Sequence, residues 1–473
     1  VIARVPQSPG RDTLSTHNST AKTKNLQNGG VLCPHSVGRQ TFGYSQVSSK
    51  NKYFYAIIEA DENPSTAPTF IHLAGGPGIS AMDPLLVLNG PCLIQKDGGG
   101  LDANPYSWTR KANGIWIDAP GTTGFSLGPI ETTLAEYMND LFNLLLDVFR
   151  KYPHLNHNVH LVGFSSYSST AVLLASKIIL PFKSAIDLKG VMIVSAMVGP
   201  SYVYQGCLQM AKDKKLVSQT VLKKMTTDIK SCVNLVAKCK PAKPGGEPGP
   251  AACSAAQDAC DTAAILPVFM MLCTFAGPPV NELVDSVRRK KESKTFEWDL
   301  TLFNAYDIRV RAGNEAKYYR FLPGNPTDFY NSKDVQTKLG VSKAWKPLDK
   351  EVLAHFIKYA AFDVTFAVNQ VLDAGLKVMV VSGDSDFITN GIGALNWMLS
   401  LKGTKSYGEK LKAVRPVPIS YADGPLGNIR RLVYSNGAKI AFLNVTGGCH
   451  DMIFNQPSGM QQAFQDYLAG KLW

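Results

Sequence analysis

Short apolar segments recur along this chain and alternate with longer stretches whose hydrophobic residues follow a helical spacing. The strand-like segments are 40–47, 52–59, 69–73, 115–118, 159–162, 188–195, 376–382 and 440–445. Residues 131–152 predict an amphipathic helix, because one side carries Leu134, Met138, Leu141, Leu144, Leu145, Val148 and Phe149. Buried strands that alternate with helices predict an α/β fold, with a mostly parallel central sheet and helices on both faces.

The strand pattern disappears between residues 201 and 348, where cysteines, a Pro/Gly-rich tract and a basic run are found instead. We interpret this region as a helical cap that interrupts the α/β core. The chain is long enough for a large α/β domain with an insertion. We therefore expect an extended N-terminal arm (1–28), a first part of the core (29–200), a helical, disulfide-stapled cap insertion (201–348) and a second part of the core (349–473).

The cysteine spacing suggests how the cap is stapled. Four of the nine cysteines flank the turn-forming segment 241–250, namely Cys232, Cys239, Cys253 and Cys260. A seven-residue spacing puts each pair on one face of a helix, so we expect Cys239–Cys253 nested inside Cys232–Cys260, one of the three connectivities that four cysteines allow. Zinc is the competing interpretation, but the pairs lack C-x-x-C spacing and no histidine is near.

The remaining cysteines and the glycosylation sequons bear on the compartment. Cys207 and Cys273 are placed to form a further bridge, and Cys449 is our candidate for the unpaired cysteine. Disulfides indicate an oxidising compartment, and sequons at Asn18 and Asn444 are compatible with it. We expect a secreted protein, or one of the secretory-pathway or vacuolar lumen.

Composition excludes several classes of protein. The net charge of +12 is scattered, and its densest cluster, residues 288–291, is typical of a solvated helix face, so we expect no nucleic-acid partner. The apolar runs are too short for a membrane helix, so we expect no membrane span. Dispersed histidines and the lack of a phosphate-binding fingerprint predict neither a metal nor an organic cofactor. The oligomeric state stays open, with a homodimer among the options.

The segment that follows the run 159–162 is the first candidate for chemistry. Gly163-Phe164-Ser165 lies between a predicted strand and a predicted helix that ends at Ile179. Strand, sharp turn and helix form the setting in which a G-x-S-x-G elbow exposes a nucleophilic serine. Tyr167 stands where the second glycine of that pattern is usual, so a plain helix N-cap is the alternative interpretation.

Three further turns follow predicted strands. Residues 74–78 form a glycine cluster whose backbone N–H groups are suited to an oxyanion hole, although a tight turn has the same composition. Asp386 follows the strand 376–382, and His450 follows the strand 440–445. Loops at the carboxyl ends of parallel strands converge, and the order Ser165, Asp386, His450 is that of the α/β-hydrolase triad. Alone, each aspartate or histidine would be read as an ordinary polar loop residue.

These motifs, with others in the same order, resemble the serine carboxypeptidases, an α/β-hydrolase family that includes plant acyltransferases and a hydroxynitrile lyase. The resemblance runs from about Gln40 to the C-terminus. The motifs that carry it are His72-Leu-Ala-Gly-Gly-Pro-Gly78, Asn104-Pro-Tyr-Ser-Trp108, Asp118-Ala-Pro-Gly-Thr-Thr-Gly-Phe-Ser126, Leu188-Lys-Gly190, Tyr306-Asp-Ile-Arg309, Asp334-Val-Gln336, Ser382-Gly-Asp-Ser-Asp-Phe387 and His450.

The resemblance implies a role for each site residue. The family's G-E-S-Y-A-G falls on residues 163–168, which makes Ser165 the nucleophile, with Ser166 its neighbour. Asp386 would orient His450, and Asp384 would be structural. The implied oxyanion donors are the backbone N–H groups of Gly76 and Ser166.

The departures from the family pattern bear on the substrate. The family holds a peptide's terminal carboxylate with an asparagine and two glutamates, whose positions are occupied here by Ala74, Phe164 and Leu88. With Gly75 and Tyr167, these residues would line an apolar substrate pocket. The family cysteine that bridges to the cap is replaced by Ile79.

We therefore expect weak peptide trimming and an optimum nearer neutrality. The favoured substrate is an ester, thioester or amide of a small molecule, cleaved or transferred through an acyl-enzyme. Two alternatives remain. One is a carboxypeptidase with altered C-terminal recognition. The other is a family member that binds or rearranges a ligand without acylation, as a lyase, a cyclase or a non-catalytic binding protein.

Overall fold

The computed structural model describes residues 30–180, 185–243, 246–268, 305–310 and 314–473. The predicted arm, the basic cluster at 288–291, the sequon at Asn18 and Cys273 lie outside these ranges. Within the described ranges, no helix combines the length and the apolar character needed to cross a membrane.

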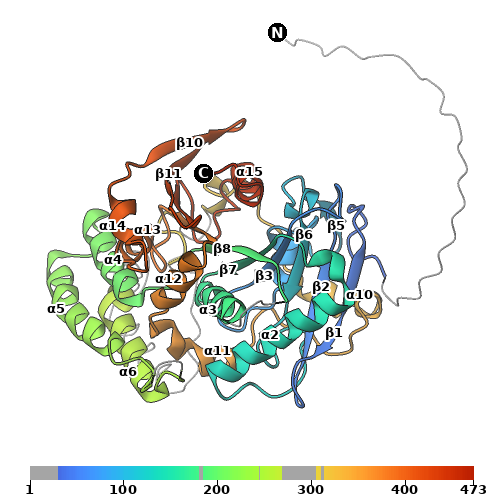
Figure 1. Cartoon of the computed structure of the whole chain (residues 1–473), viewed down its shortest axis with the longest axis horizontal. Coiled ribbons are helices and arrows are strands. Elements are labelled where there is room, and N and C mark those ends of the chain that lie inside the picture. Colours follow the sequence, from blue (N-terminus) through green and yellow to red (C-terminus); the bar gives the residue numbers. More distant parts are fainter. Residues whose placement is uncertain (1–29, 181–184, 244–245, 269–304, 311–313) are drawn as a thin grey trace, which may run out of the picture.

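The centre of the molecule is a ten-stranded sheet with the order β1-β2-β6-β3-β7-β8-β9-β12-β11-β10 (Figure 1). The strands from β6 to β12 in this order pair in parallel, and both ends of the sheet are antiparallel. The bounds are β1 Gln40–Gln46, β2 Lys52–Ile58, β3 Thr69–Leu73, β6 Asn113–Ile117, β7 Val159–Phe164, β8 Leu188–Val194, β9 Lys377–Gly383, β10 Val417–Tyr421, β11 Gly424–Val433 and β12 Lys439–Val445; β4 (Cys92–Ile94) and β5 (Leu101–Ala103) form a separate pair.

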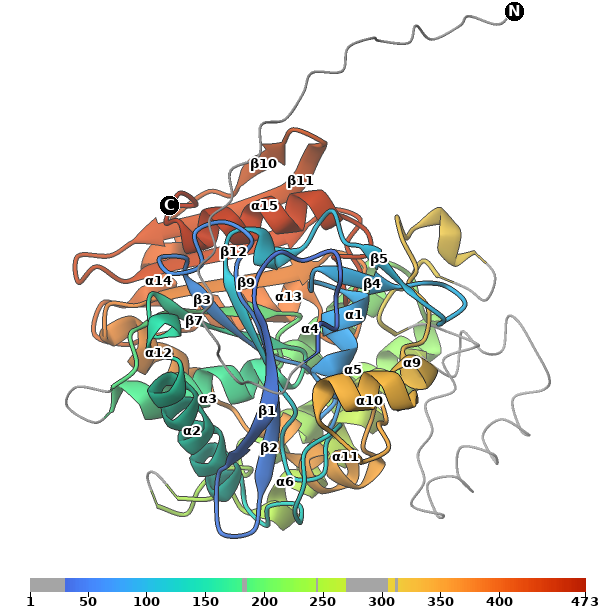
Figure 2. The ribbon, with the colours of Figure 1, turned by 90° about the vertical axis from the view of Figure 1, so that its right-hand side faces the viewer.

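The central strands are buried on both faces. In β7, Leu161 belongs to one hydrophobic cluster and Val162 to another, and β8 alternates in the same way. Helices α2 (Leu134–Lys151), α3 (Tyr167–Ile179) and α12 (Thr365–Asp373) contribute to the first cluster, and α1 (Met82–Val87) and α15 (Pro457–Leu468) to the second. Figure 2 shows α15 on one side of the sheet, with α2 and α3 on the other. The predicted layered α/β architecture is confirmed.

The other helices follow the core and the region predicted as a cap. Residues 200–265 contain α4 (Pro200–Asp213), α5 (Gln219–Val236), α6 (Pro250–Cys260) and a π-helical turn (Asp261–Ile265). Further along the chain are α9 (Thr327–Asn331), α10 (Lys333–Leu339), α11 (Lys350–Phe356), α13 (Gly391–Leu399) and α14 (Tyr407–Lys412), with short 3-10 turns at Trp108–Arg110, Pro153–Leu155, Glu315–Lys317 and Ile357–Ala361. The domain limits themselves stay a prediction.

The nested disulfides are confirmed. Cys232–Cys260 joins α5 to the last residue of α6, and Cys239–Cys253 joins the segment just after α5 to the first turn of α6. Cys33–Cys92 was not predicted, because its partners are 59 residues apart and share no helical spacing. Cys449 is unpaired, as expected.

Two expectations need correction. Cys207 is a free, buried cysteine, so the further bridge is wrong at this residue: its Sγ donates to the carbonyl of Phe387 at 3.2 Å and so is turned towards the core. Asn444 lies in β12 between β9 and β11, with its side-chain oxygen buried. An N-glycosylation acceptor belongs on a surface loop, so this position does not suit a glycan.

The α5–α6 disulfides should contribute measurably to stability. Replacing Cys232 and Cys260 together with serine opens a loop closed over a separation of 28 residues. We expect a loss of about 3–4 kcal/mol in the free energy of unfolding, measured by urea denaturation. The single Cys207→Ser variant, which removes no bridge, is the control. Equal stability of the double variant and the wild type would contradict this assignment.

Candidate active site

Ser165, Asp386 and His450 all follow central parallel strands at the carboxyl edge of the sheet. Ser165 follows β7, Asp386 follows β9, and His450 follows β12. Backbone hydrogen bonds continue across this edge: the Ser165 amide donates to Val194, and the Ser195 amide donates to Val381. The strand order thus brings the three predicted loops to one edge, as the sequence indicated.

Ser165 occupies a strained turn. Its φ of +52° is in the left-handed region, which a non-glycine residue adopts only when its surroundings impose it. Helix α3 leaves this turn and crosses close over β7. A Cβ on Gly163 would come within 2.4 Å of the Tyr167 carbonyl oxygen and 2.7 Å of the Ala171 side chain. Glycine at 163 is therefore required by the close approach of helix and strand.

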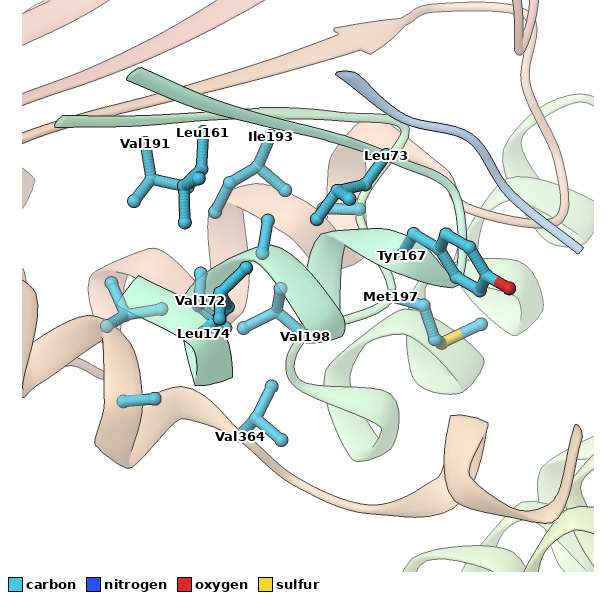
Figure 3. Packing of buried hydrophobic residues seen from close by; sticks show 14 of the residues in the cluster. Leu73, Leu161, Tyr167, Val172, Leu174, Val191, Ile193, Met197, Val198 and Val364 are labelled. Atoms are coloured by element: carbon cyan, nitrogen blue, oxygen red, sulfur yellow. The ribbon is translucent and has the colours of Figure 1, made fainter. Parts of the chain in front are cut away.

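Packing holds this helix in place. Figure 3 shows Val172 and Leu174 of α3 among Leu73, Leu161, Val191 and Ile193 of the sheet. At the start of the helix, the Tyr167 hydroxyl donates to the Ala119 carbonyl at 2.8 Å and accepts from the Gly78 amide at 2.9 Å. Tyr167, which replaces the second glycine of the elbow pattern, thus ties the serine turn to the glycine cluster.

His450 and Asp386 form a buried pair. Asp386 Oδ2 lies 2.9 Å from His450 Nδ1, with side-chain exposures of 0% and 8%. The backbone of His450 is fixed on both sides, since its amide donates to the Tyr306 carbonyl at 2.8 Å and its own carbonyl accepts from Ser195 Oγ at 2.6 Å. Burial lowers the pKa of His450, but the charge and hydrogen bond of Asp386 outweigh it, so the pKa is raised overall.

The third contact of the predicted triad is not formed. Within the described ranges, the Ser165 hydroxyl makes no hydrogen bond, to His450 or to any other residue. In free enzymes, catalytic hydrogen bonds are often long and close only around substrate. The structure therefore joins Asp386 to His450 and leaves the Ser165 hydroxyl apart from them, on the loop that follows β7.

The glycine cluster lies directly against Ser165. A Cβ on Gly75 would lie 3.2 Å from Ser165 Cβ, and Gly76 has a φ of +105°. The turn interpretation also holds, because the Ile79 amide donates to the Gly75 carbonyl at 3.1 Å. The amides of Gly76 and Ser166 donate to no acceptor in the part of the chain that the structure describes. Neither predicted oxyanion donor is thus committed to another described residue.

The three positions at which the resemblance places the family's carboxylate-binding groups are occupied by core residues. Ala74, Leu88 and Phe164 are 3%, 7% and 5% exposed and share one hydrophobic cluster. Phe164 stacks on His72, with ring centroids 4.9 Å apart, and burial lowers the pKa of His72 to about 3, so this ring is neutral. Hydrocarbon thus fills these positions, and they offer a substrate neither charge nor a hydrogen bond.

A small cavity opens beside the serine turn. Its volume is about 40 Å³, and its walls include Pro77, Ser166 and Tyr167. The other lining residues are mostly apolar: Leu134, Tyr137, Leu173, Phe356, Tyr359, Ala360, Phe362 and Val364, with the polar Ser169 and Thr170. A space of this size holds one or two water molecules, or a group of a few atoms.

Two carboxyl groups with raised pKa values were missed from the sequence: Asp451, next to His450, and Asp83, which interacts with Asp451. Burial, with a further contribution from the charge of Asp451, raises the pKa of Asp83 in α1 to about 7. Burial also raises the pKa of Asp451, an effect that His450 opposes and Asp386 reinforces. The one signal in the sequence was the position of Asp451 next to His450.

The Asp83 carboxyl should make stability depend on pH. Its pKa is about 7 in the folded chain, against an unperturbed value of 3.8. The folded state therefore holds a proton that the unfolded state releases, and the associated stability is lost as the pH rises from 4 through 7. We expect Asp83→Asn to raise the melting temperature relative to the wild type, and to raise it by more at pH 8 than at pH 5.

The control for this prediction is Asp423→Asn, which alters an exposed carboxylate in the β10–β11 turn. The difference in melting temperature between Asp423→Asn and the wild type should be the same at pH 5 and pH 8. If the change in melting temperature caused by Asp83→Asn were also the same at both pH values, the raised pKa of Asp83 would be contradicted.

A mostly parallel sheet covered by helices on both faces, with its loops converging at the carboxyl edge, is the fold of the α/β-hydrolases. A solved structure supports this: KEX1(delta)p, a prohormone-processing carboxypeptidase from Saccharomyces cerevisiae, matches with a TM-score of 0.68 at 19% identity. The match covers 94% of each chain.

The chain belongs to the serine carboxypeptidase family, whose model matches residues 33–470. Serine carboxypeptidase-like 47 from Arabidopsis thaliana is 25% identical over 468 residues, which cover 96% of this chain and 82% of the relative. Carboxypeptidase Y homolog A from Coccidioides posadasii is 24% identical over 447 residues, which cover 92% and 75%. The predicted family is confirmed, and membership implies a serine hydrolase. The disulfides agree with a secreted or lumenal protein.

Proposed function

We propose that this protein is a serine enzyme that forms an acyl-enzyme on Ser165 with an ester, thioester or amide of a small molecule. The acyl group then passes to water or to another nucleophile. The observation that carries the proposal is the buried Asp386–His450 pair, at 2.9 Å, on the sheet edge that also bears the strained Ser165 turn.

The proposed steps follow from the groups around Ser165. As substrate enters, Nε2 of His450 takes the proton from the serine hydroxyl, and Oγ attacks the acyl carbon. Asp386, bonded to Nδ1, orients the imidazole and stabilises its cation. The amides of Gly76 and Ser166 receive the developing oxyanion. His450 then gives its proton to the leaving group, and the same groups act in reverse for the acceptor.

The proposed substrate class rests on three apolar side chains of the described structure. A peptide carboxylate brought against Ala74, Leu88 and Phe164 would lose its hydration and gain no partner from these three residues, at a cost of several kcal/mol. A neutral acyl donor does not meet this cost. The small cavity beside Ser166 favours a compact group on that side.

Family membership supports one alternative, a carboxypeptidase whose C-terminal recognition relies on other residues. It would trim peptides in spite of the apolar replacements. The two proposals differ in substrate but share the nucleophile.

Labelling with a fluorophosphonate probe tests the nucleophile. We expect an adduct that peptide mapping locates on Ser165 and that is absent from Ser165→Ala. An adduct on Ser166 would move the nucleophile by one residue. A folded wild-type protein that stays unlabelled would overturn acyl-enzyme chemistry in favour of ligand binding or a non-acylating reaction.

Peptide hydrolysis from pH 4 to pH 8 tests the substrate class. We expect weak release of C-terminal residues from Phe-Leu-type peptides throughout, while a reactive p-nitrophenyl ester is cleaved. The cleavage rate should rise with pH, because His450 acts as a base only when neutral and its pKa is held above the usual 6.5. Strong peptide trimming in the acid range would support the carboxypeptidase alternative instead.

A further inference from the structure

A threonine lies between the two partners of the buried pair. Thr389 Oγ1 is 2.5 Å from Asp386 Oδ2 and 2.9 Å from His450 Nδ1. All three side chains are buried, and Thr389 is 2% exposed. The hydroxyl group therefore forms a closed triangle with the carboxylate and the imidazole, away from water.

The positions of the hydrogens in this triangle follow from the chemistry of its groups. An ionised carboxylate only accepts hydrogen bonds, so the single hydroxyl hydrogen of Thr389 is donated to Asp386 Oδ2. Towards His450, the threonine oxygen is then an acceptor, which requires a hydrogen on Nδ1. The contact between Asp386 and Nδ1 requires the same hydrogen. Both contacts thus select the tautomer whose lone pair is on Nε2, the nitrogen that faces a serine nucleophile in a triad.

Thr389 also holds the other oxygen of the carboxylate, because its backbone amide donates to Asp386 Oδ1 at 3.2 Å. Among the residues that the structure describes, the Asp386 carboxylate receives hydrogen bonds from Thr389 and His450 alone. Apart from the contact with the imidazole, Thr389 therefore supplies every described hydrogen bond to the Asp386 carboxylate.

The threonine is itself held in place by the next residue. The Asn390 side chain caps α13 by accepting from the Gly393 amide at 2.9 Å, and its Nδ2 donates to the carbonyls of Phe387 and Val203, each at 3.1 Å. These contacts fix the loop 386–390 against α4 and α13. The hydroxyl of Thr389 is thus presented by a rigid segment.

We propose that Thr389 is a positioning residue of the catalytic site: its hydroxyl orients the Asp386 carboxylate and offers the Nδ1 proton of His450 a second acceptor. The inference rests on the proposed function, since it assigns a role in activating Ser165. The imidazolium that forms when His450 takes the serine proton is then stabilised by two oxygens.

Two variants separate this role from simple packing. Thr389→Val keeps the shape of the side chain and removes the hydroxyl, whereas Thr389→Ser keeps the hydroxyl and removes the methyl group. The measurement is the rate of fluorophosphonate inactivation over a range of probe concentrations, which resolves the maximal rate constant from the apparent binding constant. Because the probe reacts with any activated serine, no natural substrate is needed.

We expect Thr389→Val to lower the maximal inactivation rate by about 10- to 100-fold, the effect of losing a hydrogen bond to a charged group, with little change in the binding constant. Thr389→Ser should stay within about threefold of the wild type. If both variants react like the wild type, or if Thr389→Ser is slowed as much as Thr389→Val, the positioning role is wrong. A wild-type protein that does not react at Ser165 would instead overturn the proposed function.

Thr389→Val leaves a buried carboxylate with fewer donors and is open to misfolding. The melting temperature of each variant is therefore measured alongside. If the valine variant does not fold, Thr389→Ala and Thr389→Ser are compared in the same way. A slow alanine variant with a normal serine variant would support the role of the hydroxyl, and equal rates would contradict it.

Discussion

The turn at Ser165 constrains the rest of this molecule most strongly. Holding a serine at a φ of +52° costs about 1–3 kcal/mol, and the structure supplies the compensation through burial. Helix α3 packs one side against β3, β7 and β8, and glycine at 163 lets it approach the strand closely. Because the sheet is buried on both faces, its carboxyl edge is where the loops can present polar groups.

The polar groups at this edge are distributed unevenly. On the side of Ala74, Leu88 and Phe164 the surroundings are apolar, and even the neighbouring His72 is neutral. Around His450, the carboxyl groups of Asp386 and Asp451 favour its protonated form. This arrangement stabilises a positive charge on His450, whereas Ala74, Leu88 and Phe164 offer no charge to a substrate carboxylate. This electrostatic contrast is the physical basis for proposing neutral acyl substrates in a family named for carboxypeptidases.

The sequence predicted the parts of the fold whose signal is continuous. Buried strands such as β7 and β9 are unbroken apolar runs, and α2 has one apolar side that the core does bury. Strands β10 and β11 were not predicted, because many of their residues are half-buried or exposed and the runs are interrupted by polar residues. The nested disulfides followed from helical spacing, whereas the Cys33–Cys92 bridge depends on tertiary structure alone.

The candidate site was predictable where a motif exists and not elsewhere. Asp386 and His450 follow strands and match family motifs, so their pairing was foreseen. Thr389 was not identified, because a threonine in a loop carries no pattern that distinguishes a hydrogen bond to a catalytic carboxylate from one to water. Asp83 was also missed, since its pKa depends on burial and on Asp451, which is distant along the chain.

Direct observation of an acyl-enzyme tests most sharply whether Ser165 is the nucleophile of this protein. Wild-type protein is mixed with a series of p-nitrophenyl esters and quenched in acid during turnover. Its intact mass is then measured by mass spectrometry, and the modified residue is located by peptide mapping. We predict a mass increase equal to the acyl group, located on Ser165 and absent from Ser165→Ala. Two results would contradict acyl-enzyme chemistry at this site. One is hydrolysis of the esters without any covalent adduct, and the other is a Ser165→Ala variant that hydrolyses them as fast as the wild type.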